Sequence, residues 1–169
     1  MWRHIAKPLL LIGLGMIPYT AQAEPGVFDD RIVFGQSAAF GGPAAALGLG
    51  MREGIQAAFN EVNRAGGVHG RKLTLISYDD GYEPDRASAN TNRLINDDKV
   101  FALIGEVGTP TSQAAQPIAT EAHVPFIGPF TGAGFLRNPS LSRCAGNGCI
   151  PILIALDANP QKMLAVRGT

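Results

Sequence analysis

The chain has 169 residues, of which 46% are hydrophobic and 17% charged, with 21 glycines and 12 prolines. This length suits one domain with a hydrophobic core, and the apolar share excludes a disordered tail. The 14 Lys and Arg balance the 14 Asp and Glu, so the chain lacks the basic field that binds nucleic acid or a membrane surface.

The first 23 residues are predicted to be a secretory signal peptide. Arg3 and Lys7 precede a short apolar run over 9–17, and Ala-Gln-Ala at 21–23 is a small-x-small pattern that signal peptidase accepts. We expect cleavage after Ala23 and a location outside the cytoplasm. The alternative, a membrane anchor, is disfavoured because the run is shorter than the roughly 18–20 residues that span a bilayer.

Beyond this segment, apolar strands alternate with helices. Strands are predicted at 31–35, 72–78, 100–105 and 124–128, and a helix follows each of the first three. The first helix ends at a Gly-Gly pair, and six of its residues are expected to face inward: Leu47, Met51, Ile55, Ala58, Phe59 and Val62. The inward residues of the third helix are expected to be Ala115, Ile118, Ala119 and Ala122.

This alternation predicts the α/β class with βαβ units and a doubly wound parallel sheet. The strands at 31–35, 100–105 and 124–128 are nearly continuous apolar runs, which is typical of central strands. The strand at 72–78 alternates and is expected nearer an edge. Ligands of such sheets bind beyond the carboxyl ends of the strands, where strand order reverses.

The glycine-rich segment 105–112 is predicted to form an anion site at that edge. It leads directly into the third helix, with Thr109 as the expected N-cap and Pro110 at the first helical position. Free N–H groups, the helix dipole and the hydroxyls of Thr109 and Thr111 would suit one carboxylate, since no lysine is present for a triphosphate. The alternative is that Thr109 only caps the helix.

Nucleotide and catalytic signatures are weak. Glycines 48, 50 and 54 fall within the first helix, so no dinucleotide fingerprint follows the first strand, and no P-loop, nucleophile elbow or zinc motif occurs. His69 and His123 are interpreted as loop residues because neither has a matched nucleophile. Asp79 and Asp80 are interpreted as caps of the turn after the second strand, with an acid pair as the alternative. We therefore expect no cofactor, no metal and no enzyme.

Several segments, taken in order, resemble the type I periplasmic binding proteins, and most of all the leucine/isoleucine/valine-binding receptors of ABC importers. The resemblance covers about 31–142 and rests on Ile-Val-Phe-Gly-Gln-Ser at 32–37, the stretches 60–73 and 78–84, Ala-Leu-Ile-Gly at 102–105, Gly-Thr-Pro-Thr at 108–111 and the stretch 124–133. It implies a Rossmann-like first lobe over 24–143, a periplasmic location, and a membrane permease as partner.

The resemblance also implies that the lobe holds the carboxylate of a branched-chain or related amino acid, or a small amide. The ligand-binding positions would be Thr109, Pro110, Thr111, Phe130, Thr131 and Gly132, with Phe40 as an apolar wall. Three alternatives stay open: a ligand-sensing module of the same fold, a secreted α/β enzyme, and a translated fragment without function.

The sequence departs from the family at two places. Tyr82 and Gly108 occupy positions that a disulfide joins in some members, and the second lobe of the family is expected to be missing. The stretch 144–169 is expected to be an atypical tail, produced by a frameshift near Arg143. The rival interpretation is a disulfide between Cys144 and Cys149 in an oxidising compartment; two thiols with no nearby histidine disfavour zinc.

Overall fold

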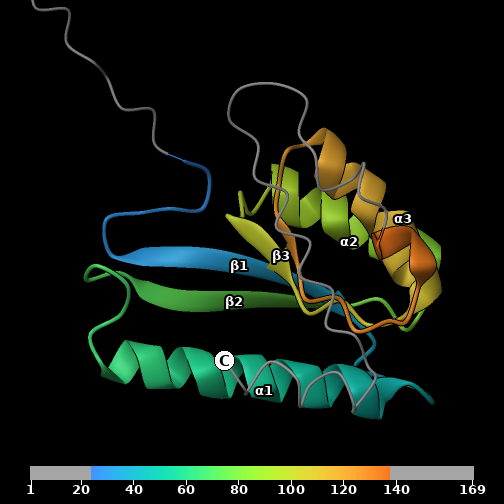
Figure 1. Cartoon of the computed structure of the whole chain (residues 1–169), viewed down its shortest axis with the longest axis horizontal. Helices are drawn as coiled ribbons and strands as arrows, with labels where there is room; N and C mark the ends of the chain where they lie inside the picture. The colour runs from blue at the N-terminus through green and yellow to red at the C-terminus, as the bar shows by residue number, and fades with distance from the viewer. Residues whose placement is uncertain (1–23, 138–169) are drawn as a thin grey trace, which may run out of the picture.

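The computed structural model describes residues 24–137 and shows one parallel sheet with helices on both faces (Figure 1). The predicted signal peptide and the stretch that carries Cys144 and Cys149 lie outside these residues. The four strands have the spatial order β2-β1-β3-β4. Their bounds are β1 Arg31–Ala38, β2 Lys72–Asp79, β3 Ala102–Ile104 and β4 Phe126–Ile127.

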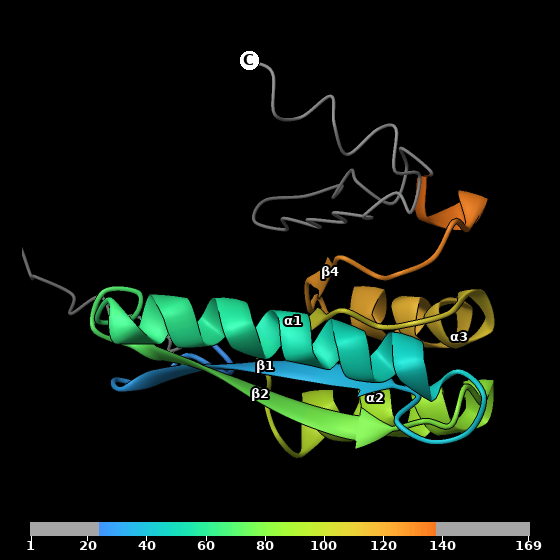
Figure 2. The same cartoon turned by 90° about the horizontal axis from the view of Figure 1, so that it is seen from below.

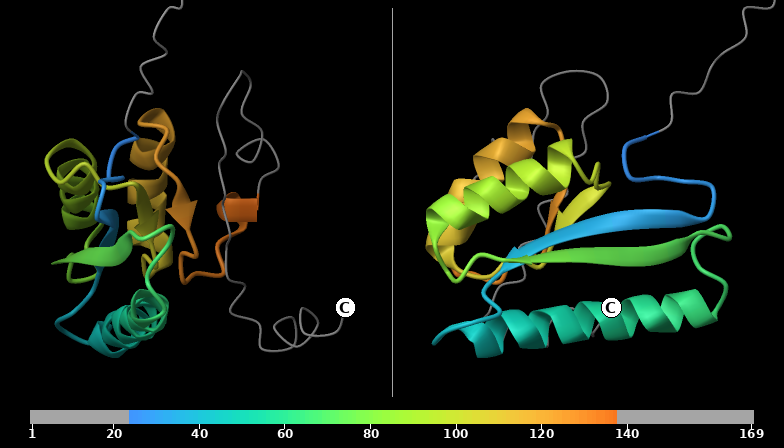
Figure 3. Two further views of the ribbon diagram at one scale, coloured as in Figure 1. Left: turned by 90° about the vertical axis from the view of Figure 1, so that its left-hand side faces the viewer. Right: turned by 180° about the vertical axis from the view of Figure 1, so that it is seen from behind.

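Three helices connect the strands, and a short 3-10 helix follows. They are α1 Ala45–Arg64, α2 Pro84–Asn96, α3 Thr109–Glu121 and η1 Gly134–Arg137. Helix α1 lies on one face of the sheet, and α2 and α3 lie together on the other (Figures 2 and 3). The predicted doubly wound α/β fold is thus confirmed. None of these helices is long and apolar enough to cross a membrane.

The direction of the crossovers explains this division of the helices. From β1 the chain moves outward to β2, and it then returns past β1 to β3 and β4. Because such crossovers are right-handed, reversing the direction puts α1 on one face and the later helices on the other. The reversal falls between β1 and β3, and β2 is the edge strand, as predicted. Within the described residues β4 ends the sheet, where a central position was expected.

Strand β1 is longer than predicted, because Gln36, Ser37 and Ala38 continue it. Both polar side chains are buried and are hydrogen-bonded to residues in, or directly after, neighbouring strands. The Gln36 amide donates to the Gly105 carbonyl over 2.9 Å, and Ser77 donates to Gln36 over 3.1 Å. A polar residue is tolerated in a buried strand when each of its groups is hydrogen-bonded, so the loop predicted from 36 onward was wrong.

Two inward predictions for α1 and one for α3 were also wrong. Leu47 is 50% exposed and Ala58 is exposed, whereas Gly48 and Ile55 are buried. Gly48 takes the inward place because its Cα lies so close to the Ala39 carbonyl that a Cβ would clash. Leu47, in the first turn, is thereby turned toward the edge of the sheet. Ala122 is exposed since it follows the last residue of α3.

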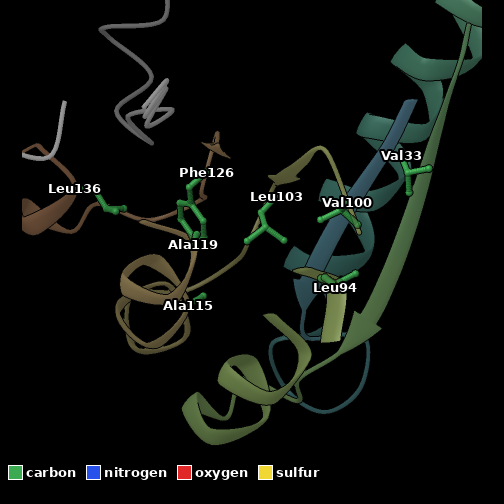
Figure 4. Close-up of a cluster of buried hydrophobic side chains, with 8 residues drawn as sticks. All are labelled: Val33, Leu94, Val100, Leu103, Ala115, Ala119, Phe126 and Leu136. Atoms are coloured by element: carbon green, nitrogen blue, oxygen red, sulfur yellow. The ribbon is translucent and has the colours of Figure 1, made fainter. Parts of the chain in front are cut away.

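The main core lies between the sheet and α2 and α3. Eight buried side chains form it: Val33, Leu94, Val100, Leu103, Ala115, Ala119, Phe126 and Leu136 (Figure 4). On the α1 face, Phe34 contacts Phe59 and Phe101, with ring centroids 5.0 and 5.8 Å apart. With both faces covered, the carboxyl edge of the sheet is where loops from different strands meet.

Candidate functional site

A hollow of about 160 Å³ lies at the carboxyl edge of the sheet. It is formed by the start of α1, the β2–α2 loop, the segment between β3 and α3, and the loop after β4. Its lining residues are Leu47, Tyr82, Val107, Gly108, Thr109, Phe130, Thr131 and Gly132. The strand order reverses beside this hollow, which is where the fold places ligands in general.

Backbone pairing joins the two main walls of the hollow. Val107 and Phe130 form a parallel bridge that extends the β3–β4 pairing beyond the strands. The Phe130 N–H donates to the Glu106 carbonyl over 2.7 Å, and the Gly108 N–H donates to the Phe130 carbonyl over 3.2 Å. Thr109 and Thr131 are therefore held side by side, although 22 positions separate them in sequence.

The hydroxyls of Thr109 and Thr131 lie 2.6 Å apart, and either can donate to the other. The Thr131 hydroxyl also accepts the Ala133 N–H over 3.2 Å. Two hydroxyls carry two hydrogens, and only one lies between them. Among the described contacts, the second hydrogen has no acceptor, so the pair can donate it to a ligand in the hollow.

The first turn of α3 adds backbone donors. Gly108 is the N-cap, with φ 107°, and Thr109 is the first helical residue, so the predicted cap was one residue late. Pro110 has no N–H, and the first helical N–H groups have no partner within the helix. The amides of Thr109 and Thr111 therefore stand at the positive end of the helix dipole.

Three sequence-predicted site residues do not line the hollow. Thr111 is 1% exposed, and its hydroxyl donates to the Val107 carbonyl over 2.7 Å, which corrects its predicted role as a hydroxyl donor to ligand. Pro110 is exposed beside the hollow. Phe40 lies instead under the Arg52 guanidinium, 4.3 Å from its ring centroid. The structure does bring together Thr109, Phe130, Thr131 and Gly132.

Four lining residues are absent from the predicted ligand-binding positions, namely Leu47, Tyr82, Val107 and Gly108, although the last two lie within the segment predicted as the anion site. Tyr82 is 37% exposed, has φ 68°, and its amide donates to Asp80 over 2.8 Å. Its ring covers Gly108, whose Cα would leave a Cβ only 2.5 Å from Tyr82 Cε2. One signal pointed here: the resemblance pairs positions 82 and 108 as disulfide sites, and the two are indeed adjacent.

Asp79 and Asp80 act as turn caps, as predicted. Asp79 accepts the N–H groups of Phe40 and Gly81 over 2.8 and 3.1 Å, and chiefly these bonds lower its pKa. Asp80 is buried, which raises its pKa, and it accepts the Ser37 hydroxyl over 2.9 Å. The pair ties the β1–α1 and β2–α2 loops together behind the hollow.

Glu106 is a buried acid that the sequence pattern does not single out. It is 1% exposed, and in the described part of the chain neither carboxyl oxygen has a hydrogen-bond partner on another residue. Burial, and to a smaller extent the charge of Asp80, raise its pKa to about 8. A single glutamate between two glycine-containing stretches forms no sequence pattern, so its burial could not be predicted.

No metal centre is formed by residues 24–137, since they hold no suitable group of three His, Cys, Asp or Glu side chains. His69 and His123 lie in loops, as predicted, and each has a positive φ.

Comparison with known proteins identifies the family to which these residues are similar. The sequence pattern of a family described as periplasmic binding protein matches residues 31–149. A Leu-, Ile-, Val-, Thr- and Ala-binding protein of Pseudomonas aeruginosa is 36% identical over 88 residues, which are 52% of this chain and 23% of that protein.

Two solved structures share the fold. A possible leucine/isoleucine/valine-binding protein from Rhodopirellula baltica has TM-score 0.64 and 44% identity, over 72% of this chain and 32% of that one. A branched-chain amino acid transporter substrate-binding protein from Streptococcus pneumoniae, in complex with isoleucine, has TM-score 0.57 and 31% identity, over 64% of this chain and 31% of that one. The chain therefore spans about a third or less of the length of these relatives.

Proposed function

We propose that this chain, which belongs to the periplasmic binding protein family and to its type I branched-chain amino acid group, forms the first lobe of the solute receptor of an importer. The family is one of binding proteins, so no reaction is assigned. The lobe would occupy 24–143, after export and removal of 1–23, and would act in the periplasm. Its partner would be the membrane permease of an ABC transporter.

The paired hydroxyls of Thr109 and Thr131 carry this proposal. They stand 2.6 Å apart at the first turn of α3, in a hollow at the carboxyl edge of the sheet. One spare hydroxyl hydrogen, the Thr109 amide and the helix dipole together suit a single carboxylate. The absence of any Lys or Arg from the lining favours one such charge over a phosphate chain.

The remaining lining suggests the rest of the ligand. Leu47, Val107 and Phe130 present apolar surface beside the hydroxyl pair, and the hollow measures about 160 Å³. A small molecule with a carboxylate and a short apolar side chain fits both features. We therefore propose a branched-chain or related amino acid, with leucine as the first probe.

Binding by this lobe is expected to be millimolar or weaker, because one lobe supplies one wall of a cleft. The test is titration of residues 24–169 with leucine, valine and a small amide such as isobutyramide, followed by calorimetry and by amide NMR shifts. We expect the largest shifts at the Gly108 and Thr109 amides. Micromolar affinity, or shifts confined to the opposite edge of the sheet, would refute the proposal.

A matched pair of variants makes the test specific. Thr109→Val keeps the shape of the side chain but removes its hydroxyl, and should weaken leucine binding about tenfold, as expected for a hydrogen bond to a charged group. Thr120→Ala changes an exposed threonine at the far end of the same helix and should leave binding intact. Equal effects of the two substitutions would contradict the assignment.

A further inference from the structure

We infer that Glu106 is a specificity-determining residue of the hollow: as a neutral carboxylic acid it lets a carboxylate bind in front of it, and as a carboxylate it repels one. This inference rests on the proposed function, because it concerns the charge of the ligand that the hollow takes.

The backbone of Glu106 belongs to the wall of the hollow, but its side chain lies behind that wall. Its carbonyl accepts the Phe130 N–H over 2.7 Å, and the next two residues, Val107 and Gly108, line the hollow. Val107 is in extended pairing with Phe130, so successive side chains point in opposite directions. The Glu106 carboxyl is therefore turned away from solvent, which agrees with its 1% exposure.

The preceding residue shows which face the carboxyl occupies. A Cβ on Gly105 would lie 2.5 Å from Ile55 Cδ1 and 2.9 Å from Met51 Cγ, so that side of the segment meets α1. Asp80, whose charge acts on Glu106, accepts the Ser37 hydroxyl, and Asn90 of α2 donates to that same hydroxyl, so the Glu106 carboxyl lies toward α2. Ser112, in the first turns of α3, is likewise buried with a hydroxyl that has no partner in the described residues. Residues 24–137 thus offer no hydrogen-bond partner to two buried polar side chains, Glu106 and Ser112.

The charged groups around Glu106 do not compensate it. From the β2–α2 loop Asp80 faces it and opposes its ionisation. On α2, Arg86 is paired with Asp79 at 3.2 Å and Arg93 lies over the Tyr78 ring. Asp85, in the first turn of α2, adds only negative charge. The elements that remain contribute none: α3 has no charged residue before its last position, the loop over 128–136 has none, and β1 offers Gln36 and Ser37. The neutral carboxylic acid is thus favoured at neutral pH, since burial raises the pKa of Glu106 to about 8.

Ionisation would act directly on a ligand's carboxylate. The N-terminus of a helix carries the equivalent of about half a positive charge, so a full negative charge behind the first turn of α3 would more than cancel it. At an effective dielectric constant of about 20, two like charges on the order of 10 Å apart lower affinity about tenfold, of which about fivefold is expected at pH 9 because binding of the acid itself favours the neutral form of Glu106. A neutral ligand would not feel this change.

The experiment uses two probes that have no amino group to titrate. Residues 24–169 are titrated with 4-methylpentanoate and with its neutral amide, 4-methylpentanamide, at pH 6.5 and pH 9, with amide NMR as the readout. In the unmodified protein the acid should bind at least about fivefold more weakly at pH 9, while the amide should bind equally at both values. In Glu106→Gln the acid should show no such loss relative to its own affinity at pH 6.5.

A second variant covers the case in which Glu106→Gln does not fold. Asp80→Asn removes the charge that opposes ionisation, so the pH at which acid binding weakens should move to a lower value. Acid binding that is independent of pH in the unmodified protein, or an equal loss in Glu106→Gln, would overturn the inference alone. If neither probe nor leucine shifts the Gly108 and Thr109 amides at any pH, the proposed function and this inference fail together.

Discussion

Gly108 is the residue on which the geometry of the hollow depends most, so Gly108→Ala is the sharpest perturbation. Its φ of 107° and ψ of 149° belong to a region that residues with a side chain rarely occupy. A methyl group there would lie 2.5 Å from Tyr82 Cε2 and 2.9 Å from Thr111 Oγ1. The substitution therefore combines backbone strain with overpacking.

The two effects have separable magnitudes. Backbone strain of this kind costs about 1–3 kcal/mol, and overpacking typically costs about 1–3 kcal/mol more. We expect Gly108→Ala to lower the free energy of unfolding by about 2–6 kcal/mol, a large share of a typical domain's stability of about 5–15 kcal/mol. The measurement is urea denaturation of residues 24–169, followed by circular dichroism at pH 6.5.

Two companion variants test the reasoning rather than the number. Tyr82→Ala removes the ring, so in that background Gly108→Ala should cost about 1–3 kcal/mol less. Gly50 of α1 has open space around it, and Gly50→Ala should stabilise the protein by about 0.5–1 kcal/mol. The same cost for Gly108→Ala with and without the tyrosine ring would refute the proposed contact.

Three further predictions concern polar side chains that are buried or partly buried. The pKa of Glu106 is raised from 4.5 to about 8, so between these pH values the folded state holds a proton that the unfolded chain has lost. The free energy of unfolding, compared with that of Glu106→Gln, should therefore fall by roughly 1.4 kcal/mol per pH unit as the pH rises across this range. A difference in urea midpoints that does not change with pH would contradict this. Gln36→Leu should cost about 1–3 kcal/mol because the Gly105 carbonyl loses its donor, whereas a change within about 0.5 kcal/mol would argue against the bond. Tyr78→Phe removes a 3.0 Å bond to Asp98 and should cost about 1 kcal/mol in the same assay, with no change if water replaces the bond.

The sequence predicted those parts of the fold in which periodicity and turn chemistry agree. Helix α1 ends at Arg64, just before the predicted Gly-Gly stop, and α3 buries the predicted Ala115 and Ala119, as a period of 3.6 requires. Helix α3 begins beside Pro110, and β2 is an edge strand whose side chains alternate. These features are local, so a short window of sequence contains their cause.

Features that depend on a distant partner escaped prediction. Gln36 and Ser37 carried the signature of a loop, yet Gly105, Ser77 and Asp80 supply hydrogen bonds that keep them in β1. Leu47 fits the inward helical period, but the approach of Gly48 to the Ala39 carbonyl rotates the first turn and leaves Leu47 at the hollow. A propensity scale describes local sequence, so it carries no information about hydrogen bonds between residues that are 40 or more positions apart.

The candidate site shows the same division between local and distant causes. Thr109 was found because it opens a helix after a glycine, and Thr131 was found through the family resemblance. The hydroxyl bond between them exists only because Val107 pairs with Phe130. Thr111 shares the local signals of Thr109, but it lies two residues further along the helix and therefore points inward. Its hydroxyl donates to the Val107 carbonyl instead. The helix period, applied to the first turn as it is applied to the core, would have separated the two threonines: a residue two positions on points roughly to the opposite side of the helix. For carboxylate sites of this type, the hydroxyl at the first helical position is therefore the one to test first, and its partner is to be sought in the loop after the next strand.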